Sequence, residues 1–196
     1  MHSFIFIGRS GCGKGTQVEL LGEYLKKQNP ETEVFHLESG AEFREFIKGD
    51  TTTQKISKQI YDDGGLQPEF LSVYMWAKIL STKFKNTEHL LIDGTPRRLH
   101  EAGALHSIFG FYKRVKPYVI YINVSRKWAE DRLLARKRID DNADDIKARL
   151  DWFESEVMPV VKYYQSHQDY NFLDINGEQT IADVQAEIVN RLDLKV

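Results

Sequence analysis

Residues 8–17 read Gly8-Arg9-Ser10-Gly11-Cys12-Gly13-Lys14-Gly15-Thr16-Gln17, and this stretch decides the fold of the chain. It follows the apolar run 4–7 and precedes a helical pattern of apolar residues over 14–28, so we expect strand, glycine-rich turn and helix. That context defines a phosphate-binding loop, because glycines let consecutive N–H groups point at one anion beside the positive end of a helix. In such a loop Lys14 reaches the outer phosphates and Thr16 faces a magnesium ion or a phosphate oxygen.

Bulk composition restricts the class of protein. The chain has 196 residues, which suits one domain, and its 41% hydrophobic and 29% charged content is ordinary for a soluble globular protein. A net charge of -2 argues against a nucleic-acid partner. Cys12 is the only cysteine, which excludes an internal disulfide. We find no apolar run of transmembrane length and no signal peptide, and therefore expect a cytoplasmic protein without a membrane partner.

The rest of the chain alternates strand and helix patterns. Strands are expected at 3–7, 34–37, 89–93, 117–124 and 172–175, separated by helical segments, which predicts a parallel sheet with helices on both faces. Between the second and third strands, 39–67 forms a helical excursion in which we expect Ser39 to cap a helix with Glu42, and Ile56 and Ile60 to point inward. We also expect Pro159 to kink a long helix.

Two motifs lie where the ligands of such a sheet bind, at the carboxyl ends of strands. One is the phosphate-binding loop, and the other is Asp93-Gly94-Thr95-Pro96-Arg97. Asp93 suits a magnesium ion held directly or through water, and the alternative is an aspartate that caps the following helix.

Arginines near segment ends give a second signal: Arg44, Arg97, Arg132, Arg136, Arg138 and Arg149. Arg132 and Arg136 have i, i+4 spacing, where like charges repel unless an anion lies between them. Phosphoryl transfer needs such groups, because charge spreads over the transferring oxygens. Each could also be a solvated surface arginine, whereas the aspartates at 140, 141, 144 and 145 argue against a nucleic-acid patch.

Taken together, these motifs resemble the adenylate kinases and, more broadly, the nucleoside monophosphate kinases of that family. Residues 13–17, Ser39-Gly40 through Arg44, 93–97, the arginines of 132–149 and Ile175-Asn176-Gly177 match its segments in order and spacing. The resemblance implies a P-loop kinase fold of class α/β, with strand order 2-3-1-4-5. It also implies one domain over 1–196, with an acceptor-binding insertion at about 38–67 and a short lid at about 135–142.

The resemblance also implies site residues, cofactors and partners. Transfer of the ATP γ-phosphate to a nucleoside monophosphate would depend on Mg²⁺, and the protein would be a monomer. The implied roles are as follows: catalysis by Lys14, Arg97, Arg138 and Arg149; ATP binding by Gly11, Cys12, Gly13, Lys14, Gly15, Thr16, Arg132, Arg136, Gly177 and Gln179; acceptor binding by Ser39, Gly40, Arg44, Gly65, Gln67, Gly94, Arg97 and Glu101; positioning of lid arginines by Asp140 and Asp141; and magnesium binding by Thr16 and Asp93.

Three features depart from the family pattern. Thr95 replaces an aromatic residue and Ser10 a common proline. Only Lys137 separates Arg136 from Arg138, so the lid has neither the length nor the cysteines for a structural zinc site. Glu101 stands where adenylate kinases usually have the Gln that reads the acceptor adenine, and a carboxylate, which only accepts hydrogen bonds, suits guanine better.

These departures leave alternatives open. AMP is the leading acceptor, with GMP, CMP and UMP as the others. A P-loop switch that hydrolyses nucleotide slowly would be another class of function, although the chain lacks the N-K-x-D motif common in GTPases. A non-catalytic relative would need a broken phosphate-binding loop or missing arginines, and the sequence has neither.

Overall fold

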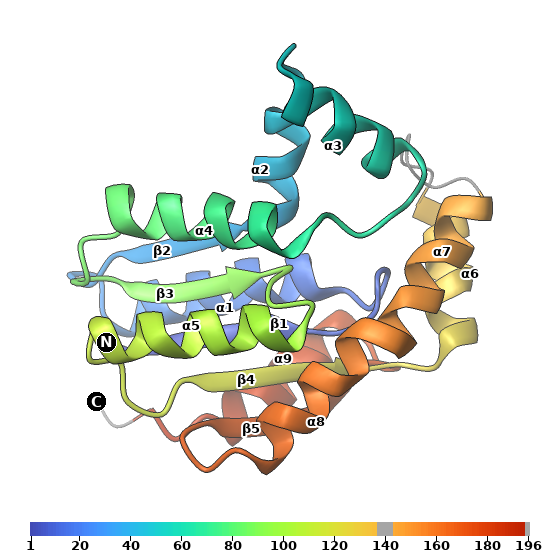
Figure 1. Ribbon diagram of the computed structural model, residues 1–196. Coiled ribbons are helices and arrows are strands. Elements are labelled where there is room, and N and C mark those ends of the chain that lie inside the picture. Colours follow the sequence, from blue (N-terminus) through green and yellow to red (C-terminus); the bar gives the residue numbers. More distant parts are fainter. Residues whose placement is uncertain (137–142, 195–196) are drawn as a thin grey trace.

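The computed structural model describes residues 1–136 and 143–194 (Figure 1). A five-stranded parallel sheet in the order β2-β3-β1-β4-β5 forms its centre, as the resemblance implies. The strands are β1 (Ser3–Ile7), β2 (Val34–Glu38), β3 (His89–Asp93), β4 (Tyr118–Asn123) and β5 (Asn171–Asn176). The helices are α1 (Lys14–Gln28), α2 (Ser39–Phe46), α3 (Thr52–Asp62), α4 (Glu69–Lys83), α5 (Leu99–Phe111), α6 (Arg126–Arg136), α7 (Ala143–Trp152), η1 (Phe153–Val157), α8 (Met158–Ser166) and α9 (Ile181–Arg191).

The side chains of β1 alternate between two hydrophobic cores. Phe4 and Phe6 pack on one face of the sheet with α1, α9 and apolar residues of α6 and α7. Ile5 and Ile7 pack on the other face with α4, α5, η1 and α8. All five residues of β1 are buried, because a central parallel strand is covered on both faces. This burial fixes the carboxyl end of β1, from which the phosphate-binding loop starts.

The excursion between β2 and β3 differs in detail from the expectation. α2 and α3 stand away from the sheet in Figure 1. The predicted cap at Ser39 is wrong: Ser39 is the first residue of α2, and its hydroxyl donates to the backbone oxygen of Asp93 at 3.2 Å. Ile56 was expected to point inward but is 57% exposed, since α3 buries only Ser57. The structure instead has a capping box at the start of α3, made by Thr51 and Gln54.

The long helix expected before β5 is divided into α7, the π-helical segment η1 and α8. The distortion lies at Phe153–Val157, and Pro159 sits in the first turn of α8. Pro159 has no N–H to donate to the carbonyl four residues earlier, and the π-helical turn, which is wider than an α-helical one, therefore precedes the proline. The predicted kink at Pro159 itself is therefore corrected to a π-helical turn that precedes it.

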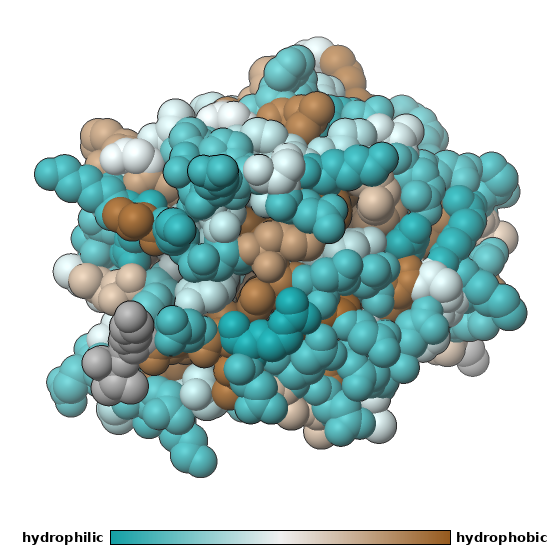
Figure 2. All heavy atoms as spheres, turned by 90° about the horizontal axis from the view of Figure 1, so that it is seen from below, coloured by the Kyte–Doolittle hydropathy of each residue, from teal (hydrophilic) through white to brown (hydrophobic). Residues whose placement is uncertain are grey.

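Within residues 1–136 and 143–194, no helix is both long and apolar enough to cross a membrane. Figure 2 shows the molecule from below, turned by 90° about the horizontal axis from the view of Figure 1. On that face hydrophilic residues predominate, and hydrophobic residues show only in separated areas between them.

Two histidines stack at the start of β3. His89 is 6% exposed, and its Nδ1 accepts the backbone N–H of His2 at 3.1 Å. The two rings lie 5.6 Å apart. Burial lowers the pKa of His89 to about 4, and the positive charges of the N-terminus, His2 and Arg114 act in the same direction. His89 is therefore neutral in the folded protein at neutral pH.

We predict that this histidine makes stability depend on pH. Its folded pKa lies below its unfolded value, so the unfolded chain binds the extra proton, and the free energy of unfolding should fall as the pH drops from about 6.5 toward about 4. Urea denaturation over this range should show a smaller slope against pH for His89→Gln than for the parent chain. His100→Gln is the control, because the His100 side chain is 91% exposed. Equal slopes for the parent chain and His89→Gln would contradict the assignment.

Candidate active site

A cleft of about 680 Å³ lies at the carboxyl ends of the central strands. Its walls come from the phosphate-binding loop, the segment after β3, the excursion between β2 and β3, and helices α6 and α7. Most of the predicted site residues within the described ranges line it: Gly11, Gly13, Lys14, Gly15, Thr16, Gly40, Arg44, Gly65, Gln67, Asp93, Gly94, Arg97, Arg132, Arg136 and Arg149. Arg138, Asp140 and Asp141 fall outside the described residues.

Left-handed glycines shape the phosphate-binding loop. Gly11 and Gly13 have φ values of 84° and 95°, a region that favours glycine. A Cβ at Gly11 would also lie 2.7 Å from the backbone oxygen of Ala129, so the position has no room for a side chain. Lys14 arches back over the loop, and its Nζ donates to the backbone oxygens of Gly8 at 2.7 Å and Arg9 at 3.0 Å. The loop's own carbonyls thus hold the ammonium group.

Arg9 anchors this loop from behind, a role that the sequence does not reveal. Its Nη1 donates to the backbone oxygen of Val124 at 2.8 Å, and its Nη2 pairs with Glu154 of η1. The guanidinium also lies over the ring of Phe153, 4.5 Å from the centroid. These contacts join the phosphate-binding loop to β4 and η1.

On the acceptor side, Arg97 and Arg44 line the cleft from different elements. Arg97 Nε donates to the backbone oxygen of Gly94 at 2.8 Å, and its guanidinium lies 5.3 Å from the ring of Trp152. Arg44 pairs with Glu38 at 2.8 Å. Both arginines are therefore held in place while their charge faces the cleft.

Arg98 and Trp152 fasten the end of the excursion. Arg98 Nη1 donates to the backbone oxygen of Gln67 at 2.6 Å, and its Nε donates to Glu156 of η1 at 3.2 Å. Trp152 Nε1 donates to the backbone oxygen of Gly64 at 3.2 Å. Sequence reasoning missed both residues, because neither belongs to a spaced motif and their partners are distant in the chain.

Gln67 and Ser39 use their side chains to hold the excursion together. The amide of Gln67 accepts from Ser57 Oγ at 2.8 Å and donates to the Ser57 backbone oxygen at 2.9 Å. Ser39 is 6% exposed and does not line the cleft. The Ser57–Gln67 pair joins α3 to the segment before α4, and the Ser39–Asp93 bond joins α2 to β3.

Glu101, a predicted acceptor-binding residue, is buried, at 1% exposed, and does not line the cleft. Its Oε2 accepts the backbone N–H of Arg97 at 2.7 Å and lies 3.5 Å from the hydroxyl of Thr95. Among the described residues, its Oε1 has no hydrogen-bond partner. Burial raises the pKa of Glu101, while the Arg97 N–H and the charges of Arg97 and Arg98 oppose that rise.

Helices α6 and α7 bring three more arginines to the cleft. Arg132 and Arg136 both line it, as expected for one helix face, and the guanidinium of Arg132 lies 4.5 Å from the Trp128 ring centroid. Arg149 Nε donates to the backbone oxygen of Asp145 at 3.2 Å. This wall adds positive charge opposite the excursion.

Three predicted ATP-binding residues do not line this cleft. Cys12 is buried within the phosphate-binding loop. Gly177 donates its N–H to the backbone oxygen of Asn123 at 2.8 Å. The Gln179 amide donates to the backbone oxygen of Asn176 and to Glu187, each at 2.8 Å. Gly177 and Gln179 therefore lie in the turn after β5. The side chain of Gln179 bonds within that turn and to Glu187 of α9.

The oxygen groups of Thr16 and Asp93 fit a magnesium ion. Both residues line the cleft, and Asp93 Oδ2 lies 4.0 Å from the position that a Cβ at Gly15 would take. A carboxylate and a hydroxyl beside a phosphate-binding loop are hard oxygen ligands, which Mg²⁺ prefers. The donor set thus agrees with the cofactor expected from the sequence.

Comparisons with known proteins agree with this architecture. The family model described as adenylate kinase matches residues 6–169. An adenylate kinase of Prochlorococcus marinus is 31% identical over 191 residues, covering 97% of this chain and 98% of the relative. Adenylate kinases of Oenococcus oeni and Flavobacterium psychrophilum are 28% and 29% identical, covering 91% and 98% of this chain and 92% and 100% of the relatives. The chain therefore belongs to the adenylate kinase family.

Proposed function

We propose that this chain transfers the γ-phosphate of ATP to a nucleoside monophosphate, with AMP as the leading acceptor, so that ATP and AMP give two ADP. The observation that carries the proposal is a single cleft lined by Lys14 on one side and by Arg44 and Arg97 on the other. Binding of ATP alone needs only Lys14 and its loop. A phosphorylated acceptor also needs cations for its own phosphate, such as Arg44 and Arg97. The curated relatives named adenylate kinase support the same activity.

The chemistry would depend on position and charge rather than on a covalent intermediate. Donor and acceptor lie in line across the cleft, and the cations neutralise charge on the transferring oxygens. Lys14 would exchange the backbone oxygens of Gly8 and Arg9 for phosphate oxygens, which are stronger acceptors because they are charged. Arg149 and Arg132 would contact the phosphates and the base of the donor from the side of α6 and α7.

Thr16 and Asp93 would hold Mg²⁺ beside the donor phosphates. The ion would supply positive charge that offsets the negative charge of the transition state. The negative charge of Asp93 also raises the pKa of Arg97, against the burial that lowers it. The roles of Arg138, Asp140 and Asp141 follow from the family resemblance alone and remain predictions.

The excursion at about 38–67 would act as the acceptor-binding insertion. Its far end is fastened by Arg98 and Trp152 at Gln67 and Gly64, while its near end leaves β2 at Glu38. A segment held at both ends can close over an acceptor as a unit, and closure excludes water that would hydrolyse ATP. The short lid at about 135–142 would cover the donor from the other side.

GMP is a second candidate acceptor, favoured by the buried carboxylate of Glu101. Guanine presents two donors, N1–H and the amino group, to a carboxylate. Adenine presents one donor and one acceptor, which a protonated Glu101 matches as a glutamine does. Burial raises the pKa of Glu101, so its protonated form persists to a higher pH than that of an exposed glutamate.

A coupled assay with Mg-ATP and each of AMP, GMP, CMP, UMP and dTMP tests the proposed function. We expect rapid ADP formation with AMP or GMP and little without an acceptor. Equal ADP formation with and without every monophosphate would indicate an NTPase and contradict the proposal.

Lys14→Ala should lower kcat at least ~10²-fold in a protein that still folds, because it removes charge stabilisation from the transition state. Lys27→Ala is the matched control, since Lys27 is an exposed lysine of the same helix. Circular dichroism would check the fold of both variants. Near-normal kcat in Lys14→Ala would refute its role.

Glu101→Gln should raise the ratio of kcat/KM for AMP over GMP and make this ratio independent of pH. In the parent chain the ratio should fall as the pH rises, because the carboxylate that forms accepts only. Glu23→Gln serves as the control, because Glu23 is an exposed glutamate of α1 that neither lines the cleft nor acts on the pKa of Glu101. The same ratio and the same pH profile in parent and Glu101→Gln would show that Glu101 does not read the base.

A further inference from the structure

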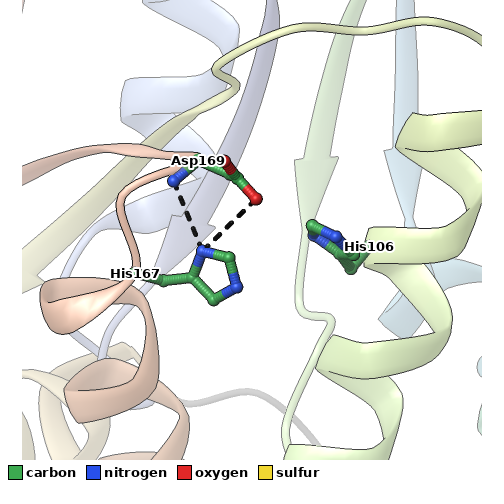
Figure 3. Close-up of side chains that lie close together, drawn as sticks. All are labelled: His106, His167 and Asp169. Carbon is green, nitrogen blue, oxygen red and sulfur yellow. Dashed lines mark hydrogen bonds and ion pairs between the residues drawn. The ribbon is translucent and has the colours of Figure 1, made fainter.

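Three metal-ligating side chains meet on the side of the molecule away from the cleft. His106 belongs to α5, and His167 and Asp169 to the connection between α8 and β5. One ring nitrogen of each histidine and one carboxylate oxygen lie within 4.8 Å of one another. Figure 3 shows the ring of His167 beside Asp169 and facing His106 across a narrow space. We propose that these three side chains bind a divalent transition-metal ion of the zinc class.

The donor set defines the class of ion. Two imidazole nitrogens and one carboxylate suit Zn²⁺ and its neighbours, whereas Mg²⁺ prefers oxygen ligands alone. Bonds of about 2.0–2.1 Å place tetrahedral ligand atoms roughly 3.4 Å apart. The side chains therefore need to draw together slightly, which is feasible because the side chain of Asp169 is 68% exposed and that of His167 28%. Water would complete the fourth position.

Neighbouring groups already orient both histidines. The hydroxyl of Tyr170 lies 2.9 Å from Nδ1 of His106. In the tautomer whose Nδ1–H donates to that hydroxyl, the lone pair of Nε2 is left for an ion. Tyr170 is itself buried, which fixes this contact. The ring of His167 packs edge-on against Tyr163 at 4.9 Å. Its Nδ1 accepts the backbone N–H of Asp169 at 3.3 Å and lies 3.8 Å from Asp169 Oδ2. Such outer contacts are what hold the ligands of metal sites in place.

The position of this cluster indicates a structural role for the ion. Asp169 precedes β5, so the cluster lies near the amino ends of the strands, and none of its three residues lines the nucleotide cleft. An ion bound there would join α5 to the α8–β5 connection, two segments that are distant in the sequence. The ligands are histidine and aspartate outside the lid, so this site differs from the cysteine zinc site that the short lid cannot form.

Zinc binding to the nucleotide-free protein tests the site directly. The parent chain should take up one more Zn²⁺ than His167→Ala, measured by equilibrium dialysis against ZnCl₂. Asp169→Asn should bind that zinc at least about tenfold more weakly, because a charged ligand becomes neutral.

Thermal unfolding gives an independent readout. At free zinc about 100-fold above Kd, the Tm of the parent chain should rise by roughly 5–10 °C, and equal Mg²⁺ should give no such rise from this site. His100→Ala should behave as the parent, since His100 is exposed on the same helix and outside the cluster. The proposal would be overturned if zinc uptake and the Tm shift were the same in the parent, His167→Ala and Asp169→Asn. It would also be overturned if both were absent in the parent.

Discussion

Positive charge concentrated in one cleft is the constraint on which the rest of the structure depends. Six cationic side chains line the cleft: Lys14, Arg44, Arg97, Arg132, Arg136 and Arg149. Four carboxylates line it as well: Glu19, Glu38, Asp93 and Asp145. The whole chain nevertheless carries a net charge of -2, so the excess of cations is local. Like charges held together cost free energy unless anions join them. Phosphates are the anions that this arrangement fits, with backbone N–H groups on one side and guanidinium groups on the other.

The π-helical turn η1 explains how the separate walls keep their positions. Glu154 holds Arg9 behind the phosphate-binding loop, and Glu156 holds Arg98 beside the excursion. Trp152, immediately before η1, contacts both Gly64 and Arg97. A π-helical turn changes the direction in which successive side chains point, and such turns occur often at functional sites. The donor loop and the acceptor wall are thus joined through one short segment of the chain.

Sequence patterns predicted the features that depend on local rules. The five strands, the first helix and the phosphate-binding loop follow from apolar runs and glycine spacing, and the structure has them within one or two residues. Most predicted cations reach the cleft because their segments end at the same edge of a parallel sheet.

Features that depend on tertiary contacts could not be predicted. Ser39 looks like a cap, yet its hydroxyl bonds to Asp93 of the neighbouring strand. Ile56 fits a helical apolar stripe, but α3 stands away from the core that would cover it. Arg9 occupies an unspecified position of the phosphate-binding loop and Arg98 follows the 93–97 motif, and their partners lie in η1, distant in the chain. Glu101 was expected in the acceptor pocket, yet it is buried outside the lining of the cleft, where its carboxylate accepts the backbone N–H of Arg97.

The central claim, that the cleft joins two nucleotides rather than hydrolysing one, is tested most directly by phosphorus NMR of the products. With Mg-ATP and AMP, the account predicts two molecules of ADP for each ATP consumed and no inorganic phosphate, and almost no ATP consumption when AMP is omitted. Release of inorganic phosphate at a rate that does not depend on AMP or any other monophosphate would contradict it.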